Sequence, residues 1–264
     1  MTTLVGSLLL VPNTLDLGAA DAPDIAELLP AGVLRRAAAL KHWIAEDAKT
    51  TRAFLKRVHA IVPLAQPLQA TEIRELPQPQ KGGAGSHGGA TSRTLHVFDD
   101  WLAPAFAGYD IGLISEAGLP GVADPGAAVV AAAHRRGVRV LPLAGASSLS
   151  LALAASGLNG QSFAFVGYLP TDAVERASRL LALQQQSRRE RQTQIAIETP
   201  YRNAALMAAL LKTLQPETQL SVACGLSLPS GWCATRTVAD WRQQRPAFEP
   251  PQPTSPAVFL WLAA

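Results

Sequence analysis

The sequence has few cysteines and few charged residues. Only two cysteines occur among 264 residues, Cys224 and Cys233, with eight residues between them and no histidine cluster nearby. This spacing excludes a disulfide framework and a zinc motif, so we expect core thiols in a reducing compartment and no metal site. Charged residues make up only 16% of the chain and hydrophobic residues 48%, which excludes global disorder and provides material for packed cores.

Long apolar runs and a strong charge of one sign are also missing. Residues 4–11 are apolar but reach Pro12 well before the roughly 20 residues that a membrane span needs. They lack the basic stretch and small-residue cleavage site of a signal peptide, so we expect a cytoplasmic protein without a membrane segment. The formal net charge of +3 is compatible with an anionic partner such as RNA, although an ordinary surface with a few extra arginines explains it more simply.

The first half of the sequence alternates between apolar runs and helical patterns. The predicted strands are residues 7–11 and 110–115, which read as buried, and the short segments 43–45 and 138–143. Apolar residues at helical spacing lie between them, within residues 24–62, 97–106 and 127–136. A repeated order of strand, loop and helix is typical of a parallel sheet with crossover connections.

The second half follows a different order, which predicts a mixed α+β arrangement. The predicted strands are residues 163–168, 193–197, 219–224 and 257–262, and the predicted helices are 173–186 and 201–214. We place the boundary near Ala146, giving an N-terminal α/β domain of residues 1–146 and a C-terminal α/β domain of residues 147–264. The glycine-rich residues 78–94 and the proline-rich residues 245–256 are expected to be surface loops.

One loop has the composition of a ligand-binding turn. Residues 115–126 read Ser-Glu-Ala-Gly-Leu-Pro-Gly-Val-Ala-Asp-Pro-Gly and directly follow a predicted buried strand. Glycines allow a backbone to approach a ligand closely, and ligands of open α/β sheets bind beyond the carboxyl ends of the strands. The loop matches neither a dinucleotide fingerprint nor a P-loop. Taken alone, its glycines and prolines are explained better by ordinary turn chemistry.

An ordered set of short motifs resembles the tetrapyrrole methylase superfamily. The resemblance is greatest to its branch of 16S ribosomal RNA ribose 2′-O-methyltransferases, of which the chain looks like a divergent member. The segments that carry the resemblance are residues 10–12, 45–47, 115–126, 141–147, 167–170 and 198–202. It implies a two-domain α/β fold with a parallel-sheet N-terminal domain, a mixed-sheet C-terminal domain and S-adenosylmethionine in the cleft between them. It also implies a homodimer, with ribosomal RNA or the small ribosomal subunit as partner.

The resemblance also suggests which residues hold the cofactor. By matching motif, these are Pro12, Ala117, Gly118, Leu119, Val122, Ser147, Ser148 and Ile197. A ribose hydroxyl acceptor would benefit from a general base, and phosphate would need cations. The substrate-side candidates are Glu46, Asp47, Arg52, Glu198 and Arg202. Each carboxylate is explained better by helix capping or a surface position, and each arginine could simply pair with a nearby acid at the surface, so no catalytic residue is assigned.

Several segments differ from the usual pattern of the branch. Residues 13–18 replace a Thr-Pro-Ile-Gly-Asn stretch, and residues 224–228 replace Arg-Glu-Leu-Thr-Lys. Glu116 stands where Asp is usual and Ala146 where Pro is usual. These changes leave three hypotheses: an RNA 2′-O-methyltransferase, a methyltransferase acting on a tetrapyrrole or other small molecule, and a non-enzymatic descendant. The arginine-rich residues 176–191 are either an RNA-facing surface or a solvated helix face.

Overall fold

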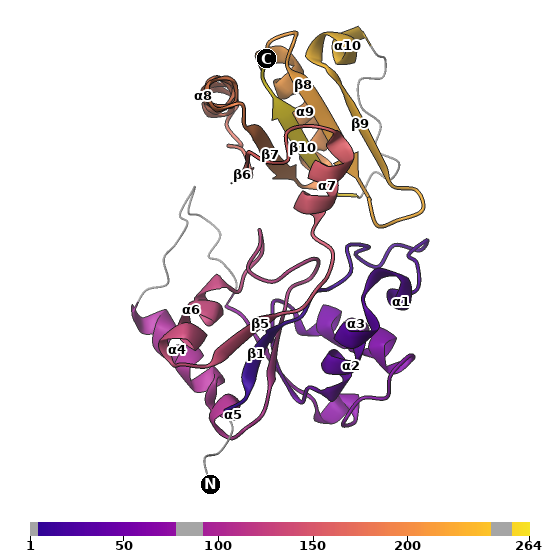
Figure 1. Ribbon diagram of the computed structural model, residues 1–264, viewed down its shortest axis with the longest axis vertical. Helices are drawn as coiled ribbons and strands as arrows, with labels where there is room; N and C mark the ends of the chain where they lie inside the picture. The colour runs from indigo at the N-terminus through magenta and orange to yellow at the C-terminus, as the bar shows by residue number, and fades with distance from the viewer. Residues whose placement is uncertain (1–4, 78–91, 244–254) are drawn as a thin grey trace. The chain divides into compact units, whose positions relative to one another are not determined.

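The computed structural model describes residues 5–77, 92–243 and 255–264 and divides into two compact units (Figure 1). Unit 1 comprises Met1–Gly18 and Pro23–Ala146, and unit 2 comprises Ala19–Ala22 and Ser147–Ala264. Most of the two expected surface loops, at 78–94 and 245–256, lies outside the described residues. Within the described ranges, no helix has both the length and the apolar composition to cross a membrane.

Unit 1 contains a five-stranded sheet in which every pairing is parallel. Its spatial order is β3-β2-β4-β1-β5. The strands are β1 (Ser7–Leu10), β2 (His42–Ala45), β3 (Glu72–Glu75), β4 (Ile111–Ile114) and β5 (Arg139–Pro142). Strands are therefore added on both sides of β1: β2, β3 and β4 lie on one side of it, and β5 lies on the other.

Helices cover both faces of this sheet. They are α1 (Ile25–Leu28), α2 (Ala31–Ala39), α3 (Ala48–His59), α4 (Ser92–Trp101), α5 (Ala103–Phe106) and α6 (Ala127–Arg135), with a short 3₁₀ turn at Leu68–Ala70. Leu9 and Trp43 pack in a buried cluster with side chains of α1, α2 and α3. Leu8 and Ile44 pack in another with side chains of α4, α5 and α6. Successive residues of each strand thus face opposite sides of the sheet, as the two-residue period of a strand requires. Figure 1 shows α2 and α3 on one side of β1 and β5, with α4 and α6 on the other.

Unit 2 contains a mixed sheet in the order β6-β7-β10-β8-β9. Only β6 and β7 pair in parallel, and the remaining pairs are antiparallel. The strands are β6 (Phe163–Gly167), β7 (Thr193–Glu198), β8 (Gln219–Cys224), β9 (Trp232–Thr237) and β10 (Ala257–Leu262). The helices are α7 (Ser148–Ser156), α8 (Ala173–Glu190), α9 (Asn203–Thr213) and α10 (Val238–Gln243), with a 3₁₀ turn at Pro200–Arg202. The predicted fold class, a parallel sheet followed by a mixed one, is confirmed.

The structure differs from the sequence prediction at a few elements. Strands β3 and β9 and helix α10 were not predicted. The single helix predicted for residues 97–106 is wrong, because it is interrupted at the fully buried Leu102. Pro104 has no backbone N–H to continue the helical ladder, so α4 ends and α5 begins as a separate turn.

Candidate functional site

The loops that follow the parallel strands of unit 1 meet at one edge of the sheet. Because β1, β2, β4 and β5 run in the same direction, the loops after all four leave from the same edge. Strand β1 lies between β4 and β5, and the chain connections diverge on either side of it. Open α/β sheets bind ligands beyond the carboxyl ends of the strands, at the point where the connections diverge in this way. We call this edge, with its loops, the carboxyl edge.

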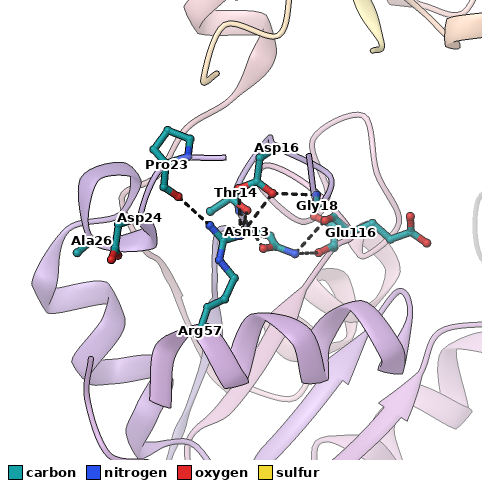
Figure 2. A network of polar contacts seen from close by, with 10 residues as sticks. Asn13, Thr14, Asp16, Gly18, Pro23, Asp24, Ala26, Arg57 and Glu116 are labelled. Carbon is teal, nitrogen blue, oxygen red and sulfur yellow. Dashed lines mark hydrogen bonds and ion pairs between the residues drawn. The ribbon is translucent and has the colours of Figure 1, made fainter. Parts of the chain in front are cut away.

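Asn13 joins the loop after β1 to the loop after β4. Its backbone N–H donates to the Gly118 carbonyl oxygen at 2.8 Å. Its side-chain amide donates to the carbonyl oxygens of Ser115 (3.2 Å) and Glu116 (2.9 Å), and its side-chain oxygen accepts from the Thr14 N–H (Figure 2). Asn13 is only 6% exposed, so it holds the two loops together from inside.

The rest of the first loop is held by a buried ion pair. Asp16 is 4% exposed, and its carboxylate lies 3.0 Å from the Arg57 guanidinium of α3. Arg57 also donates to the Thr14 hydroxyl at 3.1 Å and to the Pro23 carbonyl oxygen at 3.3 Å (Figure 2). Asp16 accepts a further hydrogen bond from the Gly18 N–H. The segment that departs from the expected family pattern is therefore fixed by its own polar network.

A close approach shapes the loop after β5, and positive φ angles shape the loop after β4. A Cβ on Gly145 would lie 2.2 Å from Cβ and 2.4 Å from Cγ of the buried Pro12, so the backbone of residue 145 packs directly against the proline ring. Gly118 has φ +67°, a conformation that residues with a Cβ rarely adopt. Ala123 nevertheless has φ +67°, and such strain is concentrated at ligand-binding loops.

Four carboxylates gather where β2 and β4 end. The Glu46 carboxylate accepts the Glu116 N–H at 3.0 Å. Burial and the charges of Glu46 and Asp47 raise the pKa of Glu116. Burial, with the charges of Glu46 and Glu116, raises the pKa of Asp124 to about 7, while contact with the Ser115 hydroxyl acts in the opposite direction. The site therefore has a negative field that a cation would relieve.

Asp47 has a different role from its three neighbours. It is the N-cap of α3, where its carboxylate accepts the Thr50 N–H at 2.6 Å. This backbone hydrogen bond holds the pKa of Asp47 below its ordinary value. Asp47 therefore caps a helix, which is one of the two explanations considered for this carboxylate from the sequence.

The raised pKa of Asp124 predicts a pH-dependent stability. Between about pH 4 and 7 the folded protein keeps Asp124 protonated, whereas the unfolded chain has ionised it at its ordinary value of 3.8. The free energy of unfolding therefore falls as the pH rises through this window and is level above it. Asp124→Asn removes this loss. The stability of the variant relative to the wild type should therefore be greater at pH 8 than at pH 4 by about 2 kcal/mol, or about 4–8 °C in melting temperature.

Thermal melts from pH 4 to 9 measure this effect. The exposed Asp100 of α4 provides the matched control, since the melting temperature of Asp100→Asn should follow that of the wild type at every pH. If the Asp124→Asn and wild-type curves ran parallel, ionisation of Asp124 would not be linked to folding.

The other residues predicted on unit 1 lie on the same loops or close to them. Ala117 and Leu119 are half-buried, and Val122 is 43% exposed. Arg52 is exposed on α3 and donates to the Ala48 carbonyl oxygen one turn earlier. Cofactor contacts by the loop residues and phosphate contacts by Arg52 stay predictions.

The residues predicted on unit 2 lie around the start of α7 and the end of β7. Ser147 is the N-cap residue of α7 and Ser148 its first residue. Ile197 packs beside the buried cluster under α7. The Glu198 side chain is 1% exposed and its carboxylate lies 3.0 Å from the Arg202 guanidinium. Arg202 also donates to the Leu169 carbonyl oxygen at 3.2 Å, so this pair serves local structure whatever else it does.

Sequence reasoning missed the residues that organise the edge. Asn13, Asp16 and Arg57 were not assigned a role, although residues 13–18 had been noted as unusual. Asp124 was part of the glycine-proline loop but was not identified as a titrating group. Among the described residues, no group of three or more His, Cys, Asp or Glu side chains is arranged to hold a metal ion.

Solved structures share the fold over nearly the full chain. The methyltransferase CobJ superimposes with a TM-score of 0.56 at 14% identity, covering 98% of this chain and 95% of CobJ. Uroporphyrin-III-C-methyltransferase from Thermus thermophilus gives a TM-score of 0.50 at 19% identity, covering 97% and 92%. A structure of the Thermus enzyme complexed with S-adenosyl homocysteine gives 0.50 at 18% identity, covering 97% of each chain.

Sequence comparison finds a second group of relatives. Ribosomal RNA small subunit methyltransferase I of Synechocystis is 40% identical over 122 residues, which are 46% of this chain and 42% of that protein. The Pseudomonas aeruginosa protein of the same name is 39% identical over 120 residues, 46% of this chain and 41% of its own length. The chain thus spans less than half the length of these relatives, and no family model matches it. The expected resemblance is therefore matched in fold by these solved methyltransferases, and in sequence, over less than half of the chain, by the ribosomal RNA small subunit methyltransferases.

Proposed function

We propose that this protein is an S-adenosylmethionine-dependent methyltransferase whose acceptor is a ribose 2′-oxygen of small-subunit ribosomal RNA. The observation that carries the proposal is the joining of loops at the carboxyl edge. Asn13 bonds to Gly118, and Gly145 packs on Pro12, so the loops after β1, β4 and β5 form one surface. The sequence similarity to ribosomal RNA small subunit methyltransferase I supports the choice of acceptor.

The charges at this edge fit the proposed cofactor. S-adenosylmethionine carries a sulfonium and an ammonium group, and Glu46, Glu116 and Asp124 supply a negative field with raised pKa values at the last two. A bound cation would lower both pKa values and remove the unfavourable repulsion. The residues proposed to hold the cofactor are Pro12, Ala117, Gly118, Leu119 and Val122 of unit 1, and Ser147, Ser148 and Ile197 of unit 2. When bound, it supplies an activated methyl group on sulfur.

The protein's own contribution would be alignment and removal of a proton. Methyl transfer is an in-line displacement, so rigid loops that fix the acceptor contribute most of the catalysis. Of the three carboxylates considered as the base, Asp47 caps α3 with a lowered pKa, and Glu198 is paired with Arg202. The lowered pKa makes Asp47 a weaker base, and the Arg202 guanidinium occupies the Glu198 carboxylate. Glu46, at the end of β2 and half-buried, is the candidate we retain.

Two measurements test this proposal in sequence. Calorimetry should show S-adenosylmethionine or its demethylated product binding at micromolar strength, about 8 kcal/mol. Transfer of labelled methyl from the cofactor to unmodified small ribosomal subunits should follow, and digestion should place the label on a ribose. Absence of heat and of a thermal shift at millimolar cofactor would overturn every enzymatic hypothesis.

A tetrapyrrole or other small molecule is the alternative acceptor, favoured by the fold of CobJ and the uroporphyrin-III-C-methyltransferase. Binding of a small-subunit RNA fragment across a range of salt concentrations distinguishes the two, because phosphate contacts give a steep salt dependence. Of the arginines between 176 and 191, Arg176 donates to the carbonyl oxygens of Pro170 and Thr171, and Arg189 pairs with Glu190. RNA contact would therefore depend most on the exposed Arg179, Arg188 and Arg191.

The resemblance supports two further parts of the proposal. One is assembly as a homodimer, for which light scattering should give twice the 27.8 kDa of a single chain. The other is location in the cytoplasm, which fractionation of the source cells would test.

A further inference from the structure

A pocket of about 410 Å³ lies at the opposite edge of the unit 1 sheet. It is formed where strands begin: Ser7 starts β1, Arg139 starts β5, and Asp110 directly precedes β4. Because these strands are parallel and four residues long, their starts lie roughly 13 Å from the carboxyl edge. The pocket is therefore separate from the site proposed for methyl transfer.

Three cations from three different segments line this pocket. Arg36 comes from the last turn of α2, Lys41 from the residue before β2, and Arg139 from the first residue of β5. All three are exposed, and within the described part of the chain none of them lies within 4 Å of a carboxylate oxygen. Asp110 is the one carboxylate in the lining, and its Oδ1 accepts the Ser7 N–H at 2.7 Å. The lining thus carries two more positive charges than negative ones.

Three other arginines of unit 1 are, by contrast, neutralised by a nearby carboxylate. Arg57, Arg74 and Arg135 each form an ion pair of 3.2 Å or less with a nearby carboxylate. Gathering like charges around a concavity is unfavourable in the free protein and becomes favourable when an anion is bound. The arrangement therefore points to an anionic ligand.

An aromatic side chain orders one wall of the pocket. Lys41 Nζ lies 5.9 Å from the centre of the Tyr109 ring, within reach of a cation–π interaction. The His42 ring meets Tyr109 edge-on at 5.4 Å, and His42 is bonded to Glu72 at 3.0 Å. Tyr109 is held by these contacts, and it helps to position the Lys41 ammonium at the pocket.

We infer that this pocket binds the phosphate group of a phosphate ester. Two guanidinium groups supply the planar donors that match phosphate oxygens, and Lys41 adds a point charge. A volume of about 410 Å³ accommodates a ligand the size of a nucleotide, since small-molecule sites span roughly 300–1,000 Å³. The inference does not depend on methyl transfer, because no residue of the carboxyl edge takes part.

Titrations of the full chain, followed through its backbone amide NMR signals, test the inference. The probes are inorganic phosphate, uridine monophosphate and a single-stranded RNA decamer. Saturable shifts are expected at residues 108–110 and 139. The triple variant Arg36→Gln, Lys41→Gln, Arg139→Gln should weaken binding at least tenfold. The matched control is Arg35→Gln, Lys56→Gln, Lys212→Gln, which removes the same charge from exposed positions outside the pocket and should change affinity less than twofold.

The three probes identify the source of the phosphate. Saturation by phosphate and by uridine monophosphate identifies a free phosphate ester, whereas saturation by the decamer alone, with steep salt dependence, identifies an RNA backbone. Melting curves check that each triple variant folds. If the pocket triple variant does not fold, the single variant Arg139→Gln is titrated in its place. The inference is overturned if no probe gives saturable shifts at these residues, or if the two triple variants lose binding equally. Cofactor binding, measured separately, should be the same in both.

Discussion

Gly145→Ala is expected to reduce the affinity for S-adenosylmethionine at least a hundredfold. The added Cβ would lie 2.2 Å from Cβ of Pro12, closer than two non-bonded carbon atoms can approach, so the loop after β5 must move away from the loop after β1. Residue 145 is exposed, which lets the loop shift without unpacking the core. Binding should therefore be lost while the melting temperature falls by less than about 3 °C.

Calorimetry with the cofactor and with its demethylated product measures this effect. The control is Gly160→Ala in unit 2, because apart from its two chain neighbours no residue has a heavy atom within 4 Å of the position its Cβ would take. It should bind the cofactor like the wild type. Wild-type affinity in Gly145→Ala would show that the loop after β5 does not hold the cofactor, and the site residues proposed at this edge would need to be reassigned.

Arg57→Ala should lower the free energy of unfolding of unit 1 by about 3 kcal/mol. Asp16 is buried, and its carboxylate has two partners, the Arg57 guanidinium at 3.0 Å and the Gly18 N–H. Removing Arg57 leaves a buried charge without its counter-ion, which is more destabilising than the loss of the pair itself. The variant also loses the hydrogen bonds to Thr14 and Pro23. Urea denaturation monitored by circular dichroism measures the change.

Two further variants separate the charge from the packing. Lys56→Ala, an exposed neighbour on the same helix, should change the free energy of unfolding by less than about 0.5 kcal/mol. Asp16→Asn combined with Arg57→Met should recover most of the loss, because an asparagine oxygen can still accept the Gly18 N–H and no buried charge is left. A double variant as unstable as Arg57→Ala would mean that the guanidinium contributes through its hydrogen bonds rather than by neutralising Asp16.

The sequence by itself determined the elements with strong local patterns. Strands such as β1 and β4 are continuous apolar runs because both of their faces are buried, and that signal needs no knowledge of neighbours. The edge strands β3 and β9 were missed because polar residues interrupt their apolar pattern, whereas the edge strands β5 and β6 contain apolar runs that the sequence shows. Glu72, Arg74 and Glu75 of β3 carry no periodic apolar signal. Their extended conformation depends on pairing with β2, which is distant in sequence.

The candidate site divides in the same way. The loop at residues 115–126 was found from its glycines and prolines, because backbone conformation is encoded locally. Only the tertiary structure decided that Asn13 joins this loop from a position about one hundred residues earlier, and that the charges of Glu46 and Glu116 act on Asp124. The same holds for Arg36, Lys41 and Arg139, which share one pocket. The surroundings of these residues depend on which strands are neighbours in the sheet. The spacing of residues in a single sequence does not show which distant segments pair.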